Sequence, residues 1–194
     1  MATLTLHSPR TASIDALRDR RASLVTQVAG IAGFALLTGL LAQFEIRFYL
    51  WEVPITLQTV AVYGSGLFLG WRNGLLAMLL YLALGLVLPF YAGGASGAAH
   101  LIGATGGYLL GYPLASLAIG AVSQRWNTFL GSVLAVLAGS VVLFACGVTW
   151  LHFAAEHATW WESLDKGWFR FIVWDLTKIV FVGAVYSTLR RLTA

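Results

Sequence analysis

The segment FRFIVWDLTKIVFVGAVYSTL, residues Phe169–Leu189, is a long apolar run with Arg170 near its start and two charged residues further inside, Asp175 and Lys178. A membrane-spanning helix needs about 20 mostly apolar residues, and each charge near its centre costs roughly 2.5–3.5 kcal/mol on insertion scales. Residues three apart share a helix face, so these opposite charges can partly offset that cost. Ionisable residues inside a membrane usually serve function, which makes Asp175 and Lys178 candidates for a ligand site. The alternative is an ion pair that only supports packing.

Composition indicates a membrane protein. Of the 194 residues, 59% are hydrophobic and only 10% are charged, whereas a soluble domain carries about 25% charged residues. The net charge of +4 does not indicate nucleic-acid binding, because the basic residues gather at the expected membrane edges. We expect a polar N-terminal segment over residues 1–22, followed by one transmembrane domain over residues 23–194. The predicted location is the cytoplasmic membrane, with lipid around a multi-pass protein.

Six apolar runs predict an all-α protein, a compact bundle of six transmembrane helices. The predicted helices cover Leu24–Phe44, Pro54–Gly70, Gly74–Phe90, Leu101–Val122, Phe129–Leu151 and Phe169–Leu189. An even number of crossings brings both ends of the chain to the same side of the membrane.

The basic residues between these runs predict which side that is. Eight lie on the side of the termini and three on the opposite side: Arg10, Arg18, Arg20, Arg21, Arg72, Arg125, Arg190 and Arg191 against Arg47, Lys166 and Arg170. Because basic residues are enriched in cytoplasmic loops, we expect both termini in the cytoplasm.

Scarce polar side chains recur at a similar predicted depth below the outer surface. In this orientation they follow the outer starts of the second, fourth and last helices: Thr56, Gln58, Thr105, Tyr108, Asp175 and Lys178. For any single threonine or glutamine, a hydrogen bond within the bundle is an equally good interpretation. Their shared depth nevertheless favours a polar pocket that opens to the outside.

The outer loop Tyr91–Gly97 is rich in glycine and is a candidate lid over this pocket. It contains Gly93, Gly94 and Ser96, and glycine reaches backbone conformations closed to other residues. A plain flexible connection is the alternative. Trp51 directly precedes the second helix and is a candidate for the pocket wall, although outer tryptophans also gather at membrane interfaces.

Other motifs give weaker signals. Ala29 and Gly33 form a small-x-x-x-small pair on the first helix, which can pack inside the bundle or meet a partner helix. The spacing of His152, Glu156 and His157 does not fit a zinc motif, and no phosphate-binding Gly-Lys-Ser/Thr motif is present. We therefore expect no metal, no cofactor and no ATP hydrolysis by this chain.

Four stretches together resemble the BioY family, the biotin-binding S components of energy-coupling-factor (ECF) transporters. They are Val53–Thr59 (VPITLQT), Tyr91–Gly94 (YAGG), Gly103–Tyr112 (GATGGYLLGY) and Asp175–Lys178 (DLTK). The resemblance runs from about Ala29 to the end of the chain. Val173 and Trp174 stand where the family usually has Pro-Gly, and Ala104 stands where it usually has proline.

This resemblance implies an S-component fold that captures biotin from outside with high affinity and carries out no reaction. It implies that Asp175 and Lys178 contact the ureido ring, and that the glycine-rich loop is the lid region. The Ala29/Gly33 face resembles the surface that docks an ECF coupling subunit, which works with two ATPases. Some family members are proposed to act without these partners, so a homo-oligomer is the alternative.

Two other functions fit the same residues. An S component of this architecture can take a different vitamin, such as thiamine or riboflavin. An intramembrane enzyme can use Asp175 and Lys178 as acid and base, but no nucleophile or second acid accompanies them.

Overall fold

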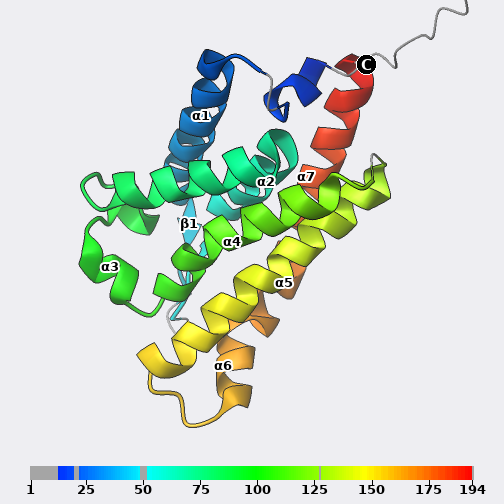
Figure 1. Cartoon of the computed structure of the whole chain (residues 1–194). Helices are drawn as coiled ribbons and strands as arrows, with labels where there is room; N and C mark the ends of the chain where they lie inside the picture. Colours follow the sequence, from blue (N-terminus) through cyan, green and yellow to red (C-terminus); the bar gives the residue numbers. More distant parts are fainter. Residues whose placement is uncertain (1–12, 20–21, 49–51, 127, 194) are drawn as a thin grey trace, which may run out of the picture.

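The computed structural model describes residues 13–19, 22–48, 52–126 and 128–193, and these residues are mostly helical (Figure 1). In chain order the elements are η1 (Ser13–Leu17), α1 (Leu24–Ala42), β1 (Glu45–Ile46), β2 (Ile55–Thr56), α2 (Gln58–Gly85), η2 (Ala92–Gly94), α3 (Ala98–Ile102), α4 (Gly106–Ser123), α5 (Phe129–Ala154), α6 (Trp160–Gly167), η3 (Phe169–Phe171) and α7 (Ile172–Thr193). Within the described part, five helices are long and apolar enough to cross a membrane: α1, α2, α4, α5 and the continuous stretch from α6 to α7.

The helices form one bundle whose two ends differ. Figure 1 shows η1 beside the last turns of α7 at one end, which we call the terminal end. The short elements β1, α3 and α6 lie at the opposite end, which we call the loop end. The strands β1 and β2 pair antiparallel, with Glu45 opposite Thr56, so they are a small exception to the predicted all-α architecture.

The predicted second and third spans are the two arms of α2. Gly70 interrupts the helix with a φ of 73°, a left-handed conformation that glycine adopts without steric cost. A Cβ at Gly74 would lie 3.0 Å from the Ser65 carbonyl oxygen, whereas nine residues of straight helix would separate them by about 13 Å. The chain therefore reverses direction at Gly70, and the second arm ends at Gly85, before the predicted Phe90.

Small residues allow α4 to pack closely against its neighbours. A Cβ at Gly107 would lie 2.1 Å from the Trp150 Cβ of α5, and one at Gly120 would lie 2.1 Å from the Trp71 nitrogen of α2. These positions have no room for a side chain, so the glycines determine how near the helices approach. The result is a tightly packed centre made of α2, α4 and α5.

Three predicted helix starts are wrong by several residues. The second helix starts at Gln58 rather than Pro54, because Ile55 and Thr56 pair with β1. The predicted fourth helix is split, because the backbone at Gly103 is extended after α3, and α4 begins at Gly106. The last helix begins at Ile172 after a 3₁₀ turn, which places Asp175 in its first turn rather than six residues down.

Candidate functional site

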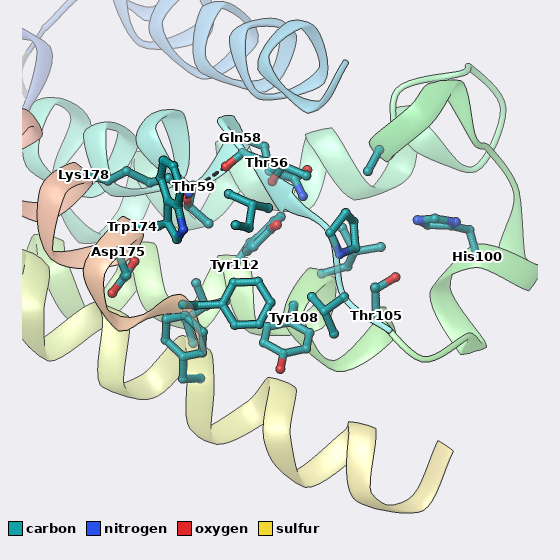
Figure 2. Close-up of a pocket in the computed structure, with 18 residues that line it drawn as sticks. Thr56, Gln58, Thr59, His100, Thr105, Tyr108, Tyr112, Trp174, Asp175 and Lys178 are labelled. Atoms are coloured by element: carbon teal, nitrogen blue, oxygen red, sulfur yellow. Dashed lines mark hydrogen bonds between the residues drawn. The ribbon is translucent and has the colours of Figure 1, made fainter. Parts of the chain in front are cut away.

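A cavity opens among the loop-end parts of α2, α4, α5 and α7, with about 620 Å³ of empty space including its mouth. Its wall includes six of the residues predicted from the sequence: Thr56, Gln58, Thr105, Tyr108, Asp175 and Lys178. In Figure 2 Asp175 and Lys178 lie toward one end of the cavity, whereas His100 and Thr105 lie at the other. The site is therefore elongated, with its charged groups concentrated at one end.

Asp175 is held by hydroxyl groups from two other helices. Its Oδ1 accepts a hydrogen bond from Tyr63 Oη at 2.5 Å, and its Oδ2 accepts one from Ser140 Oγ. The residue is 6% exposed. Because each carboxylate oxygen can accept about two hydrogen bonds, Asp175 keeps capacity to accept from a ligand N–H. Neither Tyr63 nor Ser140 was predicted, since nothing in their sequence context distinguishes them from ordinary helix residues.

Lys178 is held by the segment that leads into α2. Its Nζ donates to the Thr56 carbonyl oxygen at 2.6 Å and to Thr59 Oγ1 at 2.9 Å (Figure 2). An ammonium carries three N–H donors, so one donor is left for a ligand.

The expected packing role for the pair, a direct ion pair, is not found. Among the described residues, the ion pairs within 4.0 Å do not include Asp175 with Lys178. The spacing of three residues puts the two side chains near each other, but each one turns to partners on different elements. Both groups therefore stay available at the cavity surface.

The remaining predicted polar residues contribute in different ways. Gln58 is 7% exposed, and its Oε1 accepts from Tyr81 Oη at 3.1 Å. Tyr108 presents its ring to the cavity, while its hydroxyl donates to the Gly167 carbonyl oxygen at 2.6 Å. Tyr108 is thus a wall residue whose polar atom is already bonded.

Aromatic side chains also line the cavity and were not predicted as site residues. They are Tyr112, Phe144, Phe171 and Trp174. Phe144 also stacks on Trp168, with ring centroids 5.5 Å apart and planes 2° apart. Such residues are common in any apolar helix, so only the tertiary structure reveals which of them face the site.

The far end of the cavity continues into a second hollow at the loop end. The two share four residues, Pro54, Ala92, His100 and Thr105, and the second also reaches Arg47. The His100 ring stacks on Tyr91 at 5.1 Å. Burial lowers the pKa of the His100 imidazole below its usual value, and the charge of Arg47 lowers that pKa further. Both effects favour the neutral form of the imidazole.

The predicted lid residues do not line the cavity. Within the described residues, the loop contributes Ala92 to the wall rather than Gly93, Gly94 or Ser96. A Cβ at Gly93 would lie 2.8 Å from Glu45 Oε1, so this turn packs against the segment after α1 instead of facing inward. Trp51, the predicted wall residue, lies outside the described residues.

The small-residue pair of α1 faces away from the bundle. Ala29 and Gly33 are both exposed, and a Cβ at Gly33 would meet nothing within 4 Å. Of the two arrangements considered from the sequence, the structure favours an outward face that can meet lipid or another helix.

A cluster of hydrogen-bonded polar side chains links the segments of the loop end beside the site. His157 Nε2 lies 2.7 Å from Glu52 Oε2, and Ser163 Oγ lies 3.0 Å from His157 Nδ1 and 2.9 Å from His152 Nδ1. The order Ser–His–Glu is that of a hydrolase triad. However, Ser163 is 0% exposed, so its hydroxyl cannot reach a substrate and instead links two imidazoles.

The model of the BioY family matches residues 11–194. The chain belongs to the BioY family. Members of the family that are similar to it include the biotin transporter BioY of Thermotoga maritima, 33% identical over 141 residues, covering 72% of this chain and 82% of that protein. The probable biotin transporter BioY of Lysinibacillus sphaericus is 36% identical over 165 residues, covering 82% and 81%. This BioY-family chain is a multi-pass membrane protein.

A solved structure supports the same assignment at the level of the fold. The crystal structure of the S-component for biotin from an ECF-type ABC transporter superposes on this chain with a TM-score of 0.79 and 26% sequence identity. The match covers 86% of this chain and 92% of that one. The S-component fold that the four sequence stretches implied is therefore confirmed.

Proposed function

We propose that this BioY-family protein captures biotin in the loop-end cavity and is the substrate-binding S component of an ECF-type transporter. The observation that carries the proposal is the pair formed by Asp175 and Lys178, which presents one acceptor and one donor at one end of an aromatic-walled cavity. The ureido ring of biotin offers two N–H donors and a carbonyl acceptor, so it complements both groups.

The rest of the cavity matches the rest of the vitamin. The thioether ring and alkyl chain suit aromatic walls such as Tyr112, Phe144 and Trp174. The carboxylate tail then points toward His100, at the end of the cavity away from Asp175 and Lys178 (Figure 2). Selectivity follows, because a ligand without the ureido group would leave the spare acceptor capacity of Asp175 and the third N–H donor of Lys178 unsatisfied.

The proposed orientation places both termini in the cytoplasm and the loop end outside. The terminal end carries the larger share of basic residues, in agreement with the preference of such residues for the cytoplasmic side. Biotin then enters from outside, and the protein moves it without altering it. No cofactor is required by this mechanism.

Isothermal titration of the purified chain with biotin, thiamine and riboflavin tests the choice of ligand. We expect binding of biotin alone, and recovery of the bound biotin unchanged by mass spectrometry. Binding of thiamine or riboflavin in its place would assign the cavity to another vitamin. Conversion of biotin during the titration would favour the enzyme that uses Asp175 and Lys178 as acid and base.

The exposed pair Ala29 and Gly33 is the proposed docking face for the ECF coupling subunit, which operates with two ATPases. Gly33→Leu adds a bulky side chain where no neighbour lies within 4 Å, so folding and biotin affinity should be unchanged. In cells that also make the coupling subunit and the ATPases, the Gly33→Leu variant should take up less labelled biotin than the wild type. Equal uptake by cells making this chain alone would favour a homo-oligomer that works without those partners.

A further inference from the structure

A second polar cavity lies at the terminal end, far along α2 from the biotin site. It forms where the chain reverses at Gly70 and has about 290 Å³ of space between its walls, open solvent at its mouth included. Two guanidinium groups, from Arg18 and Arg72, line it together with the side-chain amides of Asn73 and Gln124. A lining of cations and amides is unusual beside apolar helices and suits an anion.

The two arginines have no carboxylate partner. Arg18 donates to the neutral oxygens of Tyr186 and Ser123, both at 2.7 Å. In the part of the chain that the structure describes, no Asp or Glu lies within 4.0 Å of the Arg18 or Arg72 guanidinium. Asp15 is linked to Arg18 only through the Tyr186 hydroxyl and forms its own ion pair with Arg190, so neither guanidinium of the cavity is in direct contact with a carboxylate of the described residues.

Asn73 supplies an independent indication of a ligand. Its side chain is only 6% exposed, and it makes no hydrogen bond with the residues that the structure describes. Among the described residues, every side-chain nitrogen or oxygen that is fully shielded from solvent has a hydrogen-bond partner. The Asn73 amide has no such partner, so its atoms must be slightly exposed, and the surface they reach is the cavity that Asn73 lines. Buried amides nearly always have a hydrogen-bond partner, and a bound anion would provide one.

The backbone at Gly70 also contributes positive electrostatic potential to the cavity. The left-handed residue Gly70 separates the arms of α2, so the second arm begins at Trp71 beside the cavity. The first N–H groups of a helix lack partners within it, and its start carries a partial positive charge. Anions bind readily at such positions.

We propose that this cavity binds a phosphate-type anion. Arg72 and Arg18 would provide the charge, Asn73 would donate a side-chain N–H, and the partial positive charge at the start of the second arm would add to the attraction. Two sources offer this chemistry: the headgroup of an anionic phospholipid in the surrounding leaflet, and a soluble phosphate. The proposal is independent of biotin, since it concerns the opposite end of the molecule.

The test is thermal unfolding of the purified full chain at constant ionic strength, titrated separately with phosphatidylglycerol, phosphatidylcholine and inorganic phosphate. The informative variant is Arg72→Gln, because Arg72 is exposed and its loss should not disturb packing. The matched control is Arg125→Gln, an exposed arginine that lines a different hollow. Biotin affinity, measured in parallel, shows that each variant is folded.

We expect phosphatidylglycerol to raise the unfolding midpoint and Arg72→Gln to weaken this ligand about fivefold, the usual effect of one arginine near an anionic surface. Arg125→Gln should bind as the wild type does. A matching rise with inorganic phosphate would assign the site to a soluble phosphate, and a rise with phosphatidylglycerol alone would assign it to the lipid. No rise with either anion, or equal losses in the two variants, would overturn the proposal.

Discussion

At the loop end of α7, Asp175 and Lys178 are held by neutral groups of other elements, whereas at the terminal end Arg190 is held by a carboxylate. Asp175 accepts from the hydroxyls of Tyr63 and Ser140. Arg190 Nε instead lies 3.0 Å from Asp15 Oδ2. One helix thus carries two arrangements of charge, separated by about three turns of apolar residues.

This difference distinguishes charges that can bind a ligand from charges that stabilise the fold. A charge that is paired with an opposite charge has little left to offer a ligand, and Arg190 and Asp15 mainly join η1 to α7. A charge held only by hydroxyl or carbonyl groups keeps its net charge and spare hydrogen-bonding capacity. We therefore expect substitutions at the loop end to change biotin affinity, and substitutions at the terminal end to change stability.

The largest expected effect on affinity comes from Asp175→Asn. The amide keeps the shape but loses the charge, so biotin binding should weaken by about 1.5–3 kcal/mol, the value of a hydrogen bond to a charged group. Titration calorimetry measures this loss, and Asp15→Asn is the matched control that should leave affinity unchanged. Affinity of Asp175→Asn within twofold of wild type would contradict the assignment.

Lys178→Met should have the next largest effect, a loss of about 1.5 kcal/mol in biotin binding. The methionine keeps the apolar stem but removes the donor to the ligand carbonyl and to Thr56. Arg190→Met, at the other end of the helix, should lower the unfolding midpoint without changing affinity. A Lys178→Met protein that is well folded yet binds normally would remove Lys178 from the site.

Two tyrosines allow a finer comparison. Tyr63→Phe removes the hydroxyl that holds Asp175 and should weaken biotin binding by about 0.5–1.5 kcal/mol, the net value of a hydrogen bond. Tyr186→Phe removes the hydroxyl that accepts from Arg18 and should lower stability by a similar amount. Equal losses of biotin affinity in Tyr63→Phe and Tyr186→Phe would contradict the distinction between the loop end and the terminal end.

The smallest expected effect is a dependence on pH through His100, whose pKa is lowered by burial and by Arg47. A nearby biotin carboxylate would favour the protonated ring, so affinity should rise as the pH falls from 7.5 to 5.5, by at most about fivefold. The folded protein should lose stability over the same range, because the unfolded chain binds that proton more readily. The His100→Gln variant should not show this rise in affinity. If the variant shows the same rise as the wild type, the carboxylate of biotin does not lie near His100.

Asp175 and Lys178 could be predicted from the sequence because charge in an apolar helix is costly and therefore noticeable. Their hydrogen-bond partners could not. Tyr63, Ser140 and Thr59 are ordinary residues of their helices, and only packing brings them within reach of α7. The spacing of Asp175 and Lys178 also suggested an ion pair, but tertiary partners compete with local ones and prevail here.

The apolar runs predicted the helices well and their ends less well. Hydropathy does not distinguish a helix from a short strand, so it could not show that Thr56 belongs to β2. Nor could it show the extended backbone at Gly103 that separates α3 from α4. Small-residue spacing likewise indicated close packing on both α1 and α4, but not that Gly107 meets Trp150 while Gly33 meets nothing.

The two arms of α2 are joined at Gly70 without a connecting loop. One residue inserted there would rotate the second arm by about 100° about its own axis. Tyr81, whose hydroxyl holds Gln58 in the wall of the biotin site, would then point elsewhere, as would Asn73 at the anion cavity. A length change at this single turn would therefore displace side chains at both ends of the protein at once.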